Sequence, residues 1–352
     1  MKTRFVAFAA LAAMFLNIAA FATWKTQGDT AGKRQASRLV ALLPASDAIA
    51  VFDSKRFLGD ALPKVLTANQ PLLNELMTKV REIETKTGLD LRKFEQAAVG
   101  VRYRQVSPTE VDFEPVILAS GEMNAGALVA MAKLASNGTY REEKIGERTV
   151  YVFTPKNVIQ KTASVHVNSK IAAHVEKALK SMTKDLAVTT LDRNTLVVGS
   201  LARVRETLEG RAHPTADITG LLSQKETAVV SFAGRVPGGM AKLLPLDNDE
   251  LGKNIDAIQY LAGSFDVAAA GASLQVMARM QKADQAEQLK DTLDVLRLMG
   301  KGLFGSSKRD DQKLYGRLLE NAKFTHRGTD VTLDLLVPQA DIDFLIAKVK
   351  VK

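Results

Sequence analysis

Three short motifs in the chain imitate signatures of catalysis or ligand binding. Residues 300–305 read Gly-Lys-Gly-Leu-Phe-Gly, which matches the G-x-G-x-x-G pattern of dinucleotide sites. Such a site needs the motif between a strand and a helix, so that helix N–H groups meet the pyrophosphate. Here the motif follows a helical pattern. We therefore interpret it as the end of a helix and a loop.

Two further motifs are shared with serine penicillin-binding enzymes. Residues 181–184 match S-x-x-K and residues 86–88 match K-T-G. In those enzymes the serine motif comes first and lies at the start of a helix. In this chain Ser181 comes second, in the last turn of a predicted helix, and the order argues against an acyl-enzyme mechanism.

Metal ligation has equally little support. Residues 247–252 begin like a calcium loop, but Leu251 occupies a ligand position and Ile258 stands where the bidentate Glu is required. We read this segment as a capped helix start.

The four histidines are isolated and are interpreted as surface residues: His166, His174, His213 and His326. We expect no cofactor and assign no catalytic, cofactor-binding or metal-binding residue.

The absence of cysteine removes further chemistry. Without Cys there is no disulfide, thiolate nucleophile, Cys-ligated metal or lipid-modified N-terminal Cys. Asp47, Asp53 and Asp60 lie near the first predicted strand, but helix capping and solvation explain them as well as acid–base chemistry does.

The first 22 residues have the pattern of an export signal. Lys2 and Arg4 precede an uncharged stretch over residues 5–22, which ends in Ala-Phe-Ala and predicts cleavage before Thr23. The alternative is an uncleaved anchor, because 18 apolar residues approach the length that spans a bilayer. Both interpretations place the rest of the chain outside the cytoplasm, in the periplasm or secreted, or held at the inner membrane.

The net charge of +9 is concentrated at the N-terminus. Residues 1–22 carry +2 and residues 23–40 carry +3, which leaves +4 for residues 41–352. Residues 23–40 are polar and basic and are predicted to be a linker. Because 6% of the residues are aromatic and no basic stripe is evident, we expect no nucleic-acid partner.

The remaining chain is long enough for two lobes, which we place at residues 41–215 and 216–352. The elements of the first lobe are predicted from apolar runs and helical spacing. Strands are expected at 48–52, 97–104, 115–119, 140–143, 149–153, 186–191 and 195–198, and helices at 72–83, 128–134, 171–184 and 202–208.

The second lobe repeats these kinds of element. Its strands are expected at 228–233, 264–270, 273–280, 323–325 and 331–337, and its helices near 239–258 and at 286–299, 312–322 and 341–349. The helix at 286–299 has an apolar stripe, formed by Ala286, Leu289, Leu293, Leu296 and Met299. The glycines at 300, 302 and 305 are expected to end it.

Each lobe is predicted to end in a hairpin followed by a helix. Residues 186–198 and 321–334 share the order and spacing of strand, turn and strand, with little identity. We interpret this as a repeat of architecture. Because the strands come mainly as hairpins with helices between them, the predicted class is α+β, with a mainly antiparallel sheet in each lobe.

The segment Leu43-Pro44-Ala45-Ser46-Asp47 before the first strand is similar to the lead-in of a loose group of exported bacterial proteins of unknown function. Those proteins also end in a hairpin, a Val-Pro and a short helix, as residues 335–341 do here. The resemblance implies a cell-envelope protein with two α+β lobes, and it brings no catalytic residues.

These observations favour a non-enzymatic, exported binding or envelope module. Its partner is an unidentified protein or envelope component, and membrane contact is expected only through residues 5–22, if they stay attached. The alternative is an extracytoplasmic hydrolase whose Ser or Asp site is not local in sequence. Turnover of esterase, amidase or phosphatase substrates would favour that alternative.

Overall fold

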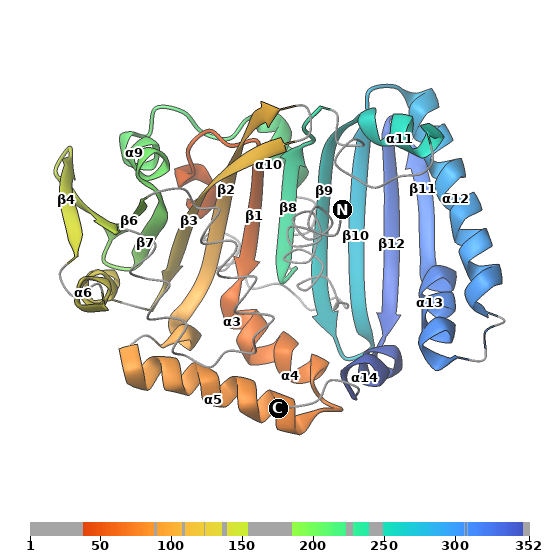
Figure 1. Ribbon diagram of the computed structural model, residues 1–352, viewed down its shortest axis with the longest axis horizontal. Coiled ribbons are helices and arrows are strands. Elements are labelled where there is room, and N and C mark those ends of the chain that lie inside the picture. Colours follow the sequence, from red (N-terminus) through yellow and green to blue (C-terminus); the bar gives the residue numbers. More distant parts are fainter. Residues whose placement is uncertain are drawn as a thin grey trace.

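One large sheet with helices packed on it forms the fold of this α+β protein (Figure 1). The computed structural model describes residues 38–87, 90–107, 110–122, 124–135, 139–153, 185–222, 228–238, 249–305, 307 and 309–347. The predicted signal, most of the linker, the predicted helix at 171–184, His166 and His174 lie outside these ranges.

The described residues of the first half of the chain supply seven strands. They are β1 (Ala48–Asp53), β2 (Phe94–Ser107), β3 (Glu110–Gly121), β4 (Tyr140–Ile145), β5 (Arg148–Phe153), β6 (Leu186–Asp192) and β7 (Thr195–Ser200). The helical elements of this half are α3 (Ser54–Arg56), η1 (Phe57–Ala61), α4 (Leu62–Val65), α5 (Gln70–Thr87), η2 (Leu91–Lys93), α6 (Ala125–Ala135), α9 (Leu201–Glu209) and α10 (Ala216–Leu222).

The second half supplies five strands and four helices among its described residues. The strands are β8 (Val230–Arg235), β9 (Ile258–Ala268), β10 (Gly271–Met280), β11 (Ala322–Arg327) and β12 (Asp330–Pro338). The helices are α11 (Asp249–Asp256), α12 (Ala283–Gly305), α13 (Asp310–Asn321) and α14 (Gln339–Ala347).

The twelve strands in the described ranges belong to a single sheet, in the order β11-β12-β10-β9-β8-β1-β2-β3-β7-β6-β5-β4. The two halves meet where β1 pairs antiparallel with β8, with Ala50 opposite Phe232. We expected a sheet in each lobe, and the structure refines this: the two sheets are the halves of one. Backbone pairing between β1 and β8 satisfies an edge that each half would otherwise expose.

The order of strands repeats between the halves. Counted outward from the junction, the first half runs β1-β2-β3-β7-β6 and the second runs β8-β9-β10-β12-β11. In each half a hairpin returns its last strand beside the third one, and a helix follows, α9 or α14. The hairpin-then-helix repeat predicted from residues 186–198 and 321–334 is present in the structure.

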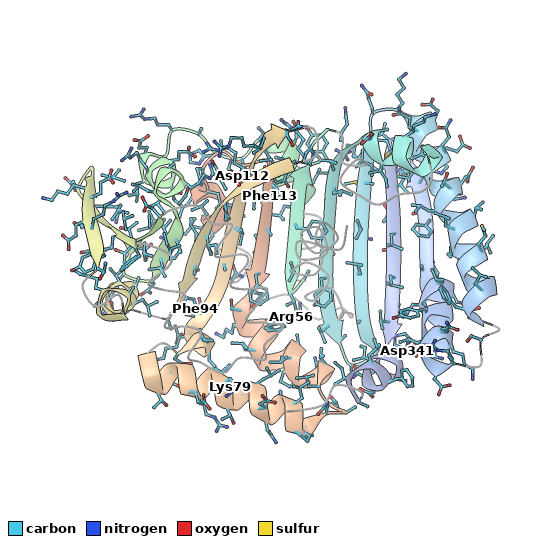
Figure 2. All side chains as sticks on the ribbon, viewed as in Figure 1. Arg56, Lys79, Phe94, Asp112, Phe113 and Asp341 are labelled. Atoms are coloured by element: carbon cyan, nitrogen blue, oxygen red, sulfur yellow. The ribbon has the colours of Figure 1, made fainter. Side chains whose placement is uncertain are left out.

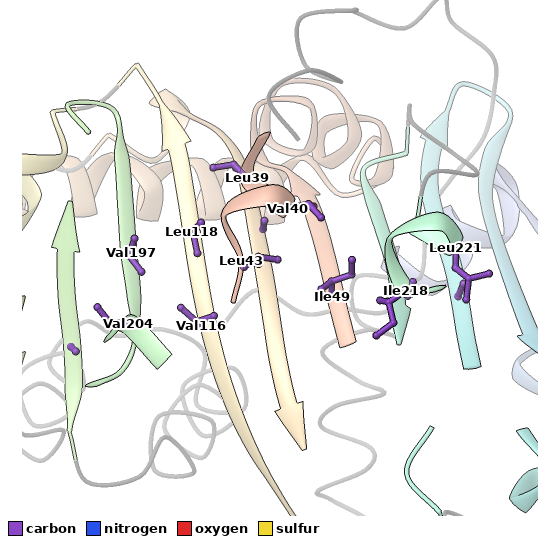
Figure 3. Packing of buried hydrophobic residues seen from close by; sticks show 14 of the residues in the cluster. Leu39, Val40, Leu43, Ile49, Val116, Leu118, Val197, Val204, Ile218 and Leu221 are labelled. Atoms are coloured by element: carbon purple, nitrogen blue, oxygen red, sulfur yellow. The ribbon is translucent and has the colours of Figure 1, made fainter. Parts of the chain in front are cut away.

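Buried side chains cover both faces of the sheet. One face is covered by helical residues 38–42, α9 and α10, which pack on the first half of the sheet and on its junction with the second. Figure 3 shows part of this cluster, including Leu43, Val116, Val197, Val204 and Ile218. On the opposite face, three smaller clusters lie under α3 and α4 with α14, under α12, and under α6. The first cluster includes Ala233 and Ala262, so the two halves share a core.

Two differences from the predicted elements have clear physical reasons. Residues 38–40, assigned to the linker, belong to the fold because Leu39 and Val40 are buried. Helix α10 was not predicted, since its seven residues are too few to show helical periodicity; Ile218 and Leu221 hold it against the sheet.

An ion pair ties the N-terminal helical residues to the β6–β7 turn, where Arg38 contacts Asp192 at 2.7 Å. Burial alone would raise the pKa of Asp192, but hydrogen bonds from Asn194, Thr195 and Arg38 hold it below its ordinary value. The stabilisation is present above the ordinary pKa and is lost as the pH falls through the folded value. We expect Asp192→Asn to lower the free energy of unfolding by about 1 kcal/mol or less at pH 7. In urea titrations the difference should shrink as the pH falls below the ordinary value of 3.8; a constant difference would contradict this.

Candidate contact surface

The long helix α12 begins as an ordinary amphipathic helix on the sheet. Ala286 and Leu289 are buried against Ala278, Met280 and Val331, and Leu293 packs beside them. In Figure 1, α12 lies at the outer edge of the molecule, beyond β11. Its first half therefore covers the end of the sheet, as its apolar spacing predicts.

The second half of α12 packs on α13 through small residues. A Cβ on Gly300 would lie 2.7 Å from Leu319 Cδ1, and one on Gly316 would lie 3.2 Å from the Gly305 nitrogen. The Phe304 and Tyr315 rings lie 5.9 Å apart near the turn between the helices. The prediction that Gly300 and Gly302 end the helix is wrong, because helix packing offsets the cost of glycine there. The helix α12 continues through both and ends at Gly305, the third glycine of the prediction.

Helix α13 is held firmly by the rest of the fold. Leu314 is buried and Leu318 packs in the cluster that contains Val337 and Ile342. Asp341 of α14, labelled in Figure 2, is also buried and accepts hydrogen bonds from Arg317 at 2.6 and 2.8 Å. This contact raises the pKa of Arg317. The helical hairpin α12–α13 is thus a fixed element rather than a loose appendage.

This hairpin exposes a group of large apolar side chains. Among the described residues, nine large apolar side chains are strongly exposed, and six of them lie on α12 and α13. We call the outward group the apolar ridge: Val295 (55% exposed), Leu298 (60%), Met299 (60%) and Leu303 (71%), with Tyr315 (52%) beside it on α13. Val295 is followed at three and four residues by Leu298 and Met299, and Leu303 comes four residues after Met299, which places the four α12 side chains along one side of the helix.

The other three strongly exposed apolar side chains are on separate elements: Val106 on β2, Leu336 on β12 and Leu345 on α14. Isolated apolar residues of this kind are normal on protein surfaces, whereas a contiguous group marks a contact site. The apolar ridge is therefore the candidate contact surface.

Basic residues are concentrated beside the apolar ridge. Residues 297–317, which we call the hairpin tip, contain six Lys or Arg and two Asp, a net charge of +4. Arg297 and Arg317 pair with Asp294 and Asp341, which lie outside that range. Residues 41–352 as a whole also carry +4, so the charges of the rest of that range cancel. Lys301 contacts Glu320 of α13 at 2.6 Å and lowers the pKa of that carboxyl. Lys313 lies 3.5 Å from Asp310.

A second charged cluster lies at the first half of the sheet and is structural. The Arg203 side chain of α9 is completely buried and donates to the Ala45 carbonyl at 2.9 Å and to Ser46 Oγ at 2.8 Å. It also pairs with Glu206, which accepts from Arg102 of β2 at 2.7 Å. Burial lowers the pKa of Arg203, and the Glu206 charge opposes this. Arg102 also pairs with Glu114 at 2.6 Å, so two carboxylates compensate the two guanidinium groups. The hydrogen bonds of Arg203 fasten residues 45 and 46 to α9.

The residues weighed in the sequence for chemistry are scattered. His213 Nδ1 lies 3.2 Å from the Leu43 carbonyl oxygen, and His326 is on β11. Asp47 accepts from the Tyr103 nitrogen at 2.9 Å, Asp53 caps α3, and Asp60 pairs with Lys64. The structure does not bring them together. Within its described ranges no group of three or more His, Asp or Glu is placed to hold a metal ion.

The apolar ridge was not predicted from the sequence. Helical spacing predicts Leu296 and Met299 on the apolar stripe, but their exposed fractions are 40% and 60%. Seven of the twelve residues from 293 to 304 are Leu, Val, Met or Phe. One helix face cannot bury seven large apolar side chains in about three turns. This density of apolar residues was the sequence signal that some of them must be exposed.

Comparisons with known proteins give only a distant likeness. No family model and no curated protein matches the sequence. Crystal forms III, IV and I of TP0453 are similar in structure, with TM-scores of 0.43, 0.42 and 0.41 and identities of 9%, 9% and 10%. Each covers 88% of this chain, and the chain covers 98%, 96% and 96% of those structures. No helix among the residues described here is long and apolar enough to cross a membrane.

Proposed function

We propose that this chain is a non-enzymatic contact module of the cell envelope, exported from the cytoplasm, and that the apolar ridge is its contact surface. One observation carries the contact role: most of the strongly exposed large apolar side chains are gathered on one rigid helical hairpin. Leaving them in water is unfavourable by about 25 cal/mol per Å² of apolar surface, so a partner that covers them gains that free energy.

Export is supported by the sequence of residues 1–22. Its test is cell fractionation followed by N-terminal sequencing of the recovered protein. We expect a chain that begins at Thr23 in the extracytoplasmic fraction, or an intact chain in the inner membrane if the segment stays as an anchor. Recovery of the intact chain from the soluble cytosol would refute the envelope assignment.

The contact role is tested separately, with a photo-crosslinking amino acid placed at Leu298 in the native cell. The matched position is Gln288, which is exposed on the same helix. We expect covalent adducts, whether with lipid or protein, at position 298 and few at position 288. Equal yields at both positions would show that the apolar ridge has no partner.

A further inference from the structure

We propose that the hairpin tip docks on the surface of an anionic lipid bilayer, with the apolar ridge in the headgroup region. The inference rests on the proposed function, which it deepens by naming the partner as a lipid surface. The sequence pattern predicts membrane contact only through residues 5–22. The hairpin tip adds a second contact, made by the folded part of the chain.

Charge complementarity identifies the lipid surface. The hairpin tip carries +4 beside the apolar ridge. Asp294, Glu320 and Asp341, outside that range, pair with three of its six basic residues, so the tip together with these partners keeps a net charge of +1. Anionic lipids attract basic residues near the surface by about 1 kcal/mol each, and interfacial helices combine such residues with Leu and Phe. Leu303 and Phe304 are followed, within five residues, by Lys308 and Arg309. The hairpin tip has this combination.

The position of the hairpin suits a flat partner. In Figure 1, α12 and α13 lie at one end of the molecule's long axis, with α12 outermost. A bilayer can therefore reach the apolar ridge without meeting the sheet. The ridge spans nine residues, about 13 Å of helix, and an interfacial helix buries its apolar face by about 5–10 Å.

A second copy of this chain fits the same surface less well. A stable dimer buries about 800 Å² on each partner. A ridge about 13 Å long on a helix about 10 Å wide offers on the order of 130 Å². A symmetric contact would also bring two positively charged tips together, which opposes association.

Flotation with lipid vesicles tests the proposal, using the chain from Thr23 onward that the proposed function implies. Omitting residues 5–22 removes their own insertion from the measurement. We expect the protein to float with vesicles of equal parts phosphatidylcholine and phosphatidylglycerol, less at high salt, and hardly with phosphatidylcholine alone. The double variant Leu298→Ser/Leu303→Ser should reduce partitioning at least about tenfold.

Matched variants separate the apolar and electrostatic contributions. Val106→Ser removes an equally exposed apolar side chain from β2 and should leave flotation unchanged. Lys301→Gln/Lys313→Gln should weaken binding to anionic vesicles at least about fivefold, whereas Lys144→Gln on β4 should have little effect. Circular dichroism and thermal unfolding would establish that each variant is folded, which the exposure of all six positions favours.

Two results would overturn the inference. One is no flotation with anionic vesicles, or flotation that the double Leu variant retains in full. The other is a dimer in sedimentation equilibrium that Leu298→Ser abolishes, which would show that a second copy covers the ridge. Either result leaves the crosslinking and fractionation tests of the proposed function standing, so the two failures are distinguishable.

Discussion

Replacement of Glu206 by Ala is expected to lower the free energy of unfolding by about 3–5 kcal/mol. Glu206 is the carboxylate that accompanies the completely buried Arg203, and it also accepts from Arg102. Without it the Arg203 charge stays buried with only the Ala45 carbonyl and Ser46 hydroxyl as partners. Urea unfolding monitored by circular dichroism measures the change.

Glu209→Ala is the matched control for this prediction. It makes the same change on the same helix, but its ion pair with Arg211 is solvent-exposed and is worth about 0–1 kcal/mol. Arg203→Met/Glu206→Ala should recover part of the loss, because it removes the buried charge as well. If Glu206→Ala and Glu209→Ala cost the same, the Arg203 cluster does not stabilise the fold.

Gly271→Ala is expected to destabilise the protein by about 3 kcal/mol or more. Gly271 begins β10 with a φ of +128°, where an L side chain is strained. A Cβ there would also lie 2.2 Å from the Val337 carbonyl oxygen and 2.7 Å from the Gln339 nitrogen. The backbone of the β10–β12 pair would have to shift. Thermal unfolding should show a lower Tm.

Gly146→Ala provides the comparison, because Gly146 also has a positive φ, +60°, at a hairpin turn. Nothing lies within 4 Å of a Cβ placed there. Only the conformational cost remains, about 1 kcal/mol. Equal effects of the two substitutions would mean that the close approach at Gly271 adds nothing.

The strands were largely predictable because their patterns are local. Each described hairpin, such as β6–β7 through Asp192 to Thr195, has apolar runs separated by turn residues. The pairing of β1 with β8 was not predictable, because more than 170 residues separate the two strands and apolar content does not specify a neighbour. The local patterns therefore predicted the strands of each half correctly, but they did not predict that the two halves pair into one sheet.

The predicted end of α12 was wrong because tertiary contacts outweigh the local preference of glycine. Glycine is a poor helix former, so ending α12 at Gly300 follows from propensity. The close packing of Gly300 on Leu319 and of Gly316 on Gly305 exists only once α13 is in place. The same contact turns Leu298 and Leu303 outward, so the contact surface depends on a neighbour that the local pattern does not reveal.

The central claim, that the apolar ridge enters the lipid interface, is tested most directly with a fluorescent probe. The chain contains no cysteine, so Leu303→Cys provides a single labelling site for a polarity-sensitive dye. Gln288→Cys, one heptad before Val295 on the same helix, is the reference position. On addition of anionic vesicles we expect a blue shift of the emission at position 303 and none at position 288. Unchanged emission at position 303, at vesicle concentrations where the protein floats, would contradict the account.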